Sequence, residues 1–232
     1  MVCTPFFVGG SLDYKLEVDN ILFAFLNGES YDYIGSSKMI YDMMNSEFPC
    51  VTNLGNSGND EDCDKVKDMT AKTWPKVNPR SIRSYLELGQ LYSSGGSDTS
   101  TQNLFVHVDP RFQSEQLIED LKNSFDKTPI NVQEASNRAR GLPPASIANF
   151  LRLAGSKPAM LLTDFDQRMS NKYYHSMYDS FVKSGVYNSS LGGKQDVVTK
   201  LCRVSESVAS HILFQVTKTL RLKMKGLMSQ VE

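Results

Sequence analysis

The sequence predicts a compact, mainly α-helical protein with one or two short strands and the option of two lobes. Three observations favour this fold class. Capping residues precede most of the apolar segments, and a long amphipathic segment lies near the C-terminus. Only two stretches have the composition of a strand. Two short strands do not build a layered α/β architecture, so we expect helices to form the core.

The N-terminal half contains three predicted helices. We expect them over residues 11–27, over residues 36–44 and from Asn78 towards residue 92. Each begins at a capping residue and carries apolar side chains on one face. Asn78 followed by Pro79 is a favourable start, because Asn caps well and Pro suits the first helical position.

The C-terminal half continues the helical pattern. We expect helices over residues 114–125, within residues 131–152, over residues 170–185 and over residues 205–230. The segment 131–152 is predicted to be two helices joined by an elbow at Pro143 and Pro144. These four regions carry most of the predicted helix of this half.

Two stretches are strand candidates. Residues 103–109 combine β-branched and aromatic side chains and end at Asp109-Pro110. Residues 159–163 form a second candidate, although their Met and Leu residues suit a helix equally well. We expect at most a hairpin or an edge pair from these two stretches.

Charge is sorted along the chain. Residues 1–100 carry 8 Lys and Arg against 14 Asp and Glu, whereas residues 101–232 carry 17 against 12. The Ser/Gly-rich stretch 92–103 lies where the sign changes, which predicts an acidic helical lobe over 1–95 and a basic helical lobe over 104–232. This asymmetry predicts a polyanionic partner, head-to-tail contacts between copies, or pairing between the two lobes.

A basic groove is predicted in the C-terminal half. If the Pro-Pro elbow folds its two helices together, Arg138, Arg140 and Arg152 line one groove, with Lys157 and Arg168 nearby. Arginine binds phosphate through paired donors, and such a groove suits single-stranded nucleic acid. The alternative is that these side chains pair with acids or face water.

The C-terminal amphipathic helix extends this basic character. Lys218, Arg221 and Lys225 lie opposite its apolar face. They predict a phosphate-contacting surface or a helix that docks on an acidic neighbour. A solvated face at the negative end of a helix dipole explains the same charges.

An Asp-x-Asp pattern provides an alternative site. Asp164 and Asp166 follow an apolar run, and two carboxylates held in this way, with Asp109 as a third, can bind a divalent ion. The competing interpretation is that one of the two aspartates caps the next helix. The commonest nucleotide-binding and metalloprotease motifs are absent from the sequence, and no cofactor is predicted.

The cysteines and the hydropathy predict a compartment. Four cysteines are scattered without a CxxC pair, which favours reduced thiols. The sequence contains no apolar run near the ~20 residues of a membrane span, and its start does not resemble a secretory signal. We therefore expect a soluble intracellular protein in a reducing compartment, without a membrane partner.

Together these observations predict a non-enzymatic, nucleic-acid-binding and self-assembling protein. It would resemble an RNA-binding nucleoprotein in its general build, and its partners would be nucleic acid and copies of itself in an oligomer or filament. Two alternatives remain open from the residues alone. One is a divalent-metal-dependent enzyme that uses Asp164 and Asp166, and the other is a protein-binding adaptor without nucleic acid.

Overall fold

A computed structural model represents the 232-residue chain. The residues that it describes are 21–45, 65–67, 73–75, 77–91, 102–136, 141–154, 157–169, 171–180 and 193–228.

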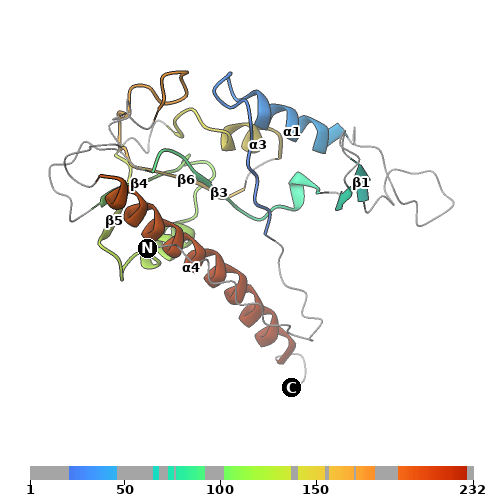
Figure 1. The fold of residues 1–232 in the computed structure, drawn as a ribbon. Coiled ribbons are helices and arrows are strands. Elements are labelled where there is room, and N and C mark those ends of the chain that lie inside the picture. Colours follow the sequence, from blue (N-terminus) through green and yellow to red (C-terminus); the bar gives the residue numbers. More distant parts are fainter. Residues whose placement is uncertain are drawn as a thin grey trace.

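A four-stranded mixed sheet forms the centre of the described structure (Figure 1). Its strands lie in the order β3 (Tyr85–Leu88), β6 (Ala159–Thr163), β4 (Gln102–His107) and β5 (Ile130–Glu134). β3 runs parallel to β6, β4 runs antiparallel to β6, and β5 runs parallel to β4. All five residues of β6 are buried, which is typical of a strand covered on both faces.

Helices α2 (Glu115–Asn123) and α4 (Gly193–Met228) cover one face of the sheet. Ser114 caps α2, since its hydroxyl oxygen accepts a hydrogen bond from the Leu117 N–H at 3.4 Å. Alternate residues of β4 and β6 face these helices and build the larger apolar core with them. The buried members of this core are Leu104, Val106, Val108, Ile118, Leu121, Phe125, Ile130, Met160, Leu162, Val204 and Val208.

Helix α3 (Ile147–Ala154) packs on the opposite face, where a second apolar cluster forms. Ala159 and Leu161 of β6 belong to this cluster, whereas Met160 and Leu162 belong to the larger core. Successive side chains of β6 therefore pack on opposite faces of the sheet. Helix α1 (Ile34–Asn45) lies beside α3 (Figure 1). Helices therefore contact both faces of the sheet.

Three short elements and the end of α4 lie outside these layers. β1 (Lys65–Lys67) and β2 (Thr73–Pro75) form an antiparallel pair, and the 3-10 helix η2 (Pro79–Ser81) precedes β3. The C-terminal part of α4 extends beyond the sheet (Figure 1). Within the ranges that the structure describes, no helix is both long and apolar enough to span a bilayer.

The predicted fold class is wrong, because a sheet rather than a helical bundle lies at the centre. The strand candidates 103–109 and 159–163 are confirmed as β4 and β6. The other two strands of the sheet correct helix predictions: β3 lies within the predicted third helix, and β5 overlaps the predicted helical segment 131–152. Both are too short for periodicity to separate a strand from a helix, and pairing with β6 and β4 decides their conformation.

Several predicted helices are confirmed. The helices over 36–44, 114–125 and 205–230 correspond to α1, α2 and α4, and the helix that carries Arg152 is α3. α4 begins at Gly193 and continues without a break through the segment that starts at residue 205. These segments have clear caps or a long apolar stripe, which are the strongest local signals of a helix.

Two predicted helices are wrong where the structure describes them. Residues 21–26 of the predicted helix 11–27 are not helical, and residues 11–20 lie outside the described residues. Residues 171–180 form a series of turns instead of a helix. The proposed lobe boundary is also largely outside the described residues, since 92–101 are not among them, and the two-lobe division stays a prediction.

Candidate functional site

The predicted basic residues do not form one surface among the described residues. Arg152 is exposed on α3, and Lys218 lies on α4, across the sheet, where it pairs with Asp120. Lys157 is half-buried before β6, and Arg168 is exposed after it. Arg138 and Arg140 lie outside the described part of the chain. Arg221 and Lys225 lie in the last turns of α4, where only the backbone is described.

The three predicted metal ligands point to different partners. The Gln90 side-chain amide donates to Asp164 Oδ1 at 2.8 Å, and the Ser136 N–H donates to Asp166 Oδ1 at 2.6 Å. Asp109 accepts two hydrogen bonds from the Arg111 guanidinium, which hold the pKa of that carboxyl below its usual value. No group of three or more potential metal ligands occurs within the described ranges.

The alternative role of the two aspartates, capping a following helix, is wrong. The residues that follow Asp166, up to Met169, form bends and no helix. Asp166 instead fastens the end of β6 to the end of β5 through the backbone and hydroxyl groups of Ser136. Hydrogen bonds from Ser136 lower the pKa of Asp166, so this contact favours the ionised carboxylate.

A different cluster of acidic and aromatic residues lies where α1 and α3 begin. Glu29 accepts hydrogen bonds from the Ser36 N–H at 2.7 Å and from the Ser146 hydroxyl. Glu87 of β3 accepts hydrogen bonds from the N–H groups of Ser146 and Ile147 at 3.1 and 2.7 Å. Ser146 therefore bridges two carboxylates, each of which satisfies an N–H group in the first turn of a helix or just before it.

Asn149 adds a second connection between the two helices. Its side-chain amide donates to Ser36 Oγ at 2.9 Å and to the Tyr33 carbonyl oxygen at 3.3 Å. Because Ser36 is fully buried and is also bound to Glu29, the start of α1 is held by several partners. The loop before α1 is thereby fixed against the first turns of α3.

The environment of Glu87 disfavours its charge. Burial raises the pKa of the Glu87 carboxyl above its usual value, and the nearby charge of Glu29 adds to the effect. Hydrogen bonds from the Ile147 and Ser146 N–H groups act in the opposite direction without cancelling it.

Tyrosine and histidine side chains lie beside these carboxylates. The rings of Tyr174 and His175 stack with centroids 4.1 Å apart, and Tyr33 lies 5.8 Å from His175. Burial raises the pKa of Tyr33 to about 12, and nearby acidic groups contribute to this increase. Tyr33 therefore keeps its hydroxyl proton to higher pH than an ordinary tyrosine.

The backbone of this region is strained at three positions. Asp32, Tyr33 and His175 have φ values of 55°, 57° and 60°. Side-chain-bearing residues rarely adopt this left-handed conformation, which costs of order 1 kcal/mol or more per residue and is found mainly at functional sites. The coincidence of all three with the acidic and aromatic cluster identifies the region as the candidate functional site.

A cavity of about 330 Å³ opens beside the cluster, between the loop before α1 and α3. Its lining combines an acid, a base, an amide and small apolar side chains. The lining residues are Asp32, Tyr33, Ser37, Pro144, Ala145, Ala148, Asn149 and Arg152. Asp32 can bind a cationic group, and Arg152 can bind a carboxylate or carbonyl oxygen.

The raised pKa of Glu87 leads to a prediction for Glu87→Gln. Between pH 4.5 and the higher pKa of the folded state, the Glu87 carboxyl binds more protons in the folded protein than in the unfolded chain. The contribution of Glu87 to stability therefore falls as pH rises. Glutamine does not ionise, and the variant should therefore gain stability relative to the wild type as pH increases. Urea unfolding from pH 4 to 7 measures this difference. Glu119→Gln, at an exposed position of α2, is the control, and an equal slope for both variants would contradict the prediction.

Sequence reasoning missed Glu29, Glu87 and Tyr33. A signal for Glu87 was present, because it lies between two leucines in a segment of apolar side chains, where a carboxylate needs a specific partner. The Asn27-Gly28-Glu29 turn before a predicted helix was a second signal, since carboxylates are favourable near a helix N-terminus. The third partner, Ser146, is distant in the sequence and could not be inferred from either signal.

The predicted reduced state is wrong for the one cysteine among the described residues. Cys202 on α4 is disulfide-bonded. The remaining three cysteines, Cys3, Cys50 and Cys63, lie outside the described residues. Disulfides persist in oxidising compartments, so this bond argues against a reducing intracellular location.

The chain is similar to known proteins over most of its length. Residues 12–213 match the family described as the nicastrin large lobe. Human nicastrin is 30% identical over 202 residues, which cover 82% of this chain and 24% of the human protein. Mouse nicastrin is 32% identical over 169 residues, covering 69% and 19%, and Arabidopsis thaliana nicastrin is 27% identical over 205 residues, covering 82% and 26%.

The chain is also similar to solved structures. One of them is the crystal structure of the gamma-secretase component Nicastrin, with a TM-score of 0.49 and 23% identity over 81% of this chain and 31% of that one. The chain spans about a quarter of the length of the curated relatives named above.

These similarities overturn the main functional prediction and favour the alternative of a protein-binding adaptor without nucleic acid. The matched family is not a nucleoprotein family, so nucleic-acid binding, RNA binding and self-assembly into an oligomer or filament are wrong for this chain, as are the corresponding partners. The intracellular, reducing location is wrong on the same ground and because of the Cys202 disulfide. The family match covers far more than half of the sequence. This chain belongs to the nicastrin large-lobe family.

Proposed function

We propose that this chain is a non-catalytic, polypeptide-binding lobe that works as part of a gamma-secretase assembly. The observation that carries the proposal is the match of residues 12–213 to the nicastrin large lobe. A nicastrin of known structure is named a gamma-secretase component. Because the chain spans about a quarter of its relatives, we assign it the role of a binding lobe rather than that of the whole subunit.

The way the carboxylates are used supports a binding role. Both oxygens of Glu29 and both oxygens of Glu87 accept hydrogen bonds from the starts of α1 and α3. A general acid or base needs an oxygen that can reach the reacting proton. In this arrangement the two carboxylates hold two helices in place and shape the adjoining cavity.

The cavity provides the polypeptide-binding surface in this proposal. Asp32 and Arg152 lie on opposite elements of its wall and offer charges of opposite sign, while Pro144 and Ala145 offer apolar contacts. The cavity is held open by the connections of Glu29 and Asn149. A preformed site of this kind binds with a smaller loss of conformational entropy.

The disulfide supports an oxidising environment for the lobe. Cys202 lies on α4, so the bond tethers the helix that covers the larger core. We place the folded chain in an oxidising compartment, where this bond persists.

Co-expression with the other gamma-secretase components tests the proposal. The tagged full chain should retain these components through affinity capture and should migrate with them on a sizing column. A chain that migrates alone, and captures no component under the same conditions, would overturn the assignment to this assembly.

Arg152→Glu tests the cavity. Reversing the charge of a central contact typically costs at least ~1.4 kcal/mol, so capture of the other components should weaken about tenfold. Arg168→Glu is the matched control, because Arg168 is also an exposed arginine but does not line the cavity. Equal capture by the two variants would show that the cavity is not the binding surface.

A further inference from the structure

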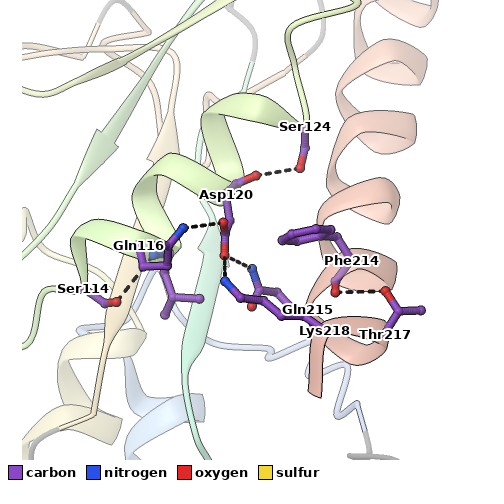
Figure 2. A network of polar contacts seen from close by, with 9 residues as sticks. Ser114, Gln116, Asp120, Ser124, Phe214, Gln215, Thr217 and Lys218 are labelled. Carbon is purple, nitrogen blue, oxygen red and sulfur yellow. Dashed lines mark hydrogen bonds and ion pairs between the residues drawn. The ribbon is translucent and has the colours of Figure 1, made fainter. Parts of the chain in front are cut away.

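A buried polar network joins α2 to α4 (Figure 2). Asp120 of α2 is only 5% exposed, and its Oδ1 accepts a hydrogen bond from Gln116 Nε2 at 2.8 Å on the same helix. Its Oδ2 accepts hydrogen bonds from Gln215 Nε2 at 2.9 Å and from Lys218 Nζ at 2.8 Å, both on α4. One carboxylate therefore connects the two helices across their contact.

His211 lies beside this network, and one of its two ring nitrogens has no hydrogen-bond partner among the described residues. His211 is one turn before Gln215 on α4, is 4% exposed, and has a hydrogen bond with the backbone of Asp120. The buried Nδ1 of His211 has no hydrogen-bond partner in the part of the chain that the structure describes. Ser207, one turn earlier on α4, has a buried hydroxyl that also has no hydrogen-bond partner among the described residues. This face of α4 thus places an ionisable ring in an environment that suits its neutral form.

Among the residues that the structure describes, few charges act on His211. On α2, Glu119 is exposed and Lys122 pairs with an acid of β5 at 3.0 Å, which leaves Asp120 as the α2 side chain whose charge acts on the ring. On α4, Lys218 is bound to Asp120. The sheet face under α4 contributes the apolar side chains of the larger core. A second positive charge at this contact would have no dedicated acceptor for the Nδ1 proton.

We propose that His211 makes the α2–α4 contact an acid-sensitive latch: its protonation releases α4 from α2 as the pH falls from neutral to mildly acidic. Imidazolium has two N–H donors, and in the docked arrangement only one of them has a partner among the described residues. Burying the other without an acceptor favours the separated helices. Release exposes the apolar side chains that α2 and α4 otherwise cover, including Leu121, Val204 and Val208.

The lowered pKa of His211 agrees with release of the helices at acidic pH. Burial lowers the pKa of His211 below its usual value, and the Asp120 hydrogen bond and charge oppose the effect without cancelling it. Between that lowered pKa and about 6.5, the released state binds more protons, so the docked state loses stability as pH falls.

Asp120 stays ionised over this range. Burial acts to raise its pKa, but hydrogen bonds from Lys218, Gln215 and Gln116 outweigh burial and hold the pKa of Asp120 below its usual value. The pH response near neutrality therefore belongs to His211 rather than to the carboxylate.

Hydrogen exchange of the full chain tests the latch. Amides of α2 and of residues 197–218 should lose protection between pH 7.5 and 5.5, after correction for the intrinsic pH dependence of exchange. The loss should reach up to about tenfold per pH unit, the limit for uptake of one proton. His211→Gln cannot ionise and should abolish this loss, whereas His175→Gln, away from the α2–α4 contact, should retain it.

The proposal is overturned if the wild type keeps its protection at pH 5.5 or if His211→Gln shows the full response. Should His211→Gln fail to fold, the histidine ring resonances of the wild type decide the question. The His211 resonance should titrate below pH 6.5, within the pH range over which protection is lost. A transition that follows His107 or His175 instead would refute the latch.

Discussion

Leu162→Ala is expected to lower the free energy of unfolding by about 2–5 kcal/mol, the range for large-to-small changes in a packed core. Leu162 is fully buried in β6 and belongs to the core formed with α2 and α4. The surrounding strands and helices cannot collapse into the space without breaking strand pairing. Urea unfolding followed by circular dichroism measures the loss.

Leu88→Ala is the matched control for this experiment. Leu88 lies opposite Leu162 in the parallel pairing of β3 and β6, but it is 45% exposed. The same atoms are removed from a neighbouring position of the same sheet, so the cost should be well below that of Leu162→Ala. Equal costs would contradict the placement of β6 at the centre of the sheet.

Cys202→Ser is expected to cost about 2–5 kcal/mol, the range for removing a native disulfide. The bond involves α4, whose Val204 and Val208 are buried in the larger core, so the loss should loosen a helix that the core needs. Chemical unfolding of the oxidised full chain, compared with the variant, provides the measurement.

Reduction provides an internal control for the disulfide. A reducing agent should destabilise the wild type by a similar amount and should have a smaller effect on Cys202→Ser. Peptide mapping under non-reducing conditions identifies the partner among Cys3, Cys50 and Cys63. Identical unfolding of the wild type with and without reductant would contradict a stabilising role of this bond.

Local signals predicted most of the long helices and two of the four sheet strands. The Ser114 cap and the apolar stripe of α4 are encoded in neighbouring residues, so they can be recognised without the fold. β3 and β5 could not be recognised in this way. Each has four or five residues, and each is stabilised by a partner strand: β3 by β6 and β5 by β4.

The candidate site depends on contacts between distant residues more than the helices and strands do. Glu29 and Glu87 are far apart in the sequence and meet through Ser146, a residue distant from both. Among the chosen basic residues that the structure describes, Arg152 on α3 and Lys218 on α4 lie on opposite faces of the sheet.

The sequence by itself determined the caps and apolar stripes of the main helices and the strand segments at β4 and β6. These features depend on residues within a few positions of one another. Only the tertiary structure decided that a mixed sheet lies between helices, that Glu29 and Glu87 meet at two helix N-termini, and that Lys218 is bound to a buried carboxylate. The physical reason is that strand pairing, burial and the satisfaction of buried charges depend on which distant residues become neighbours.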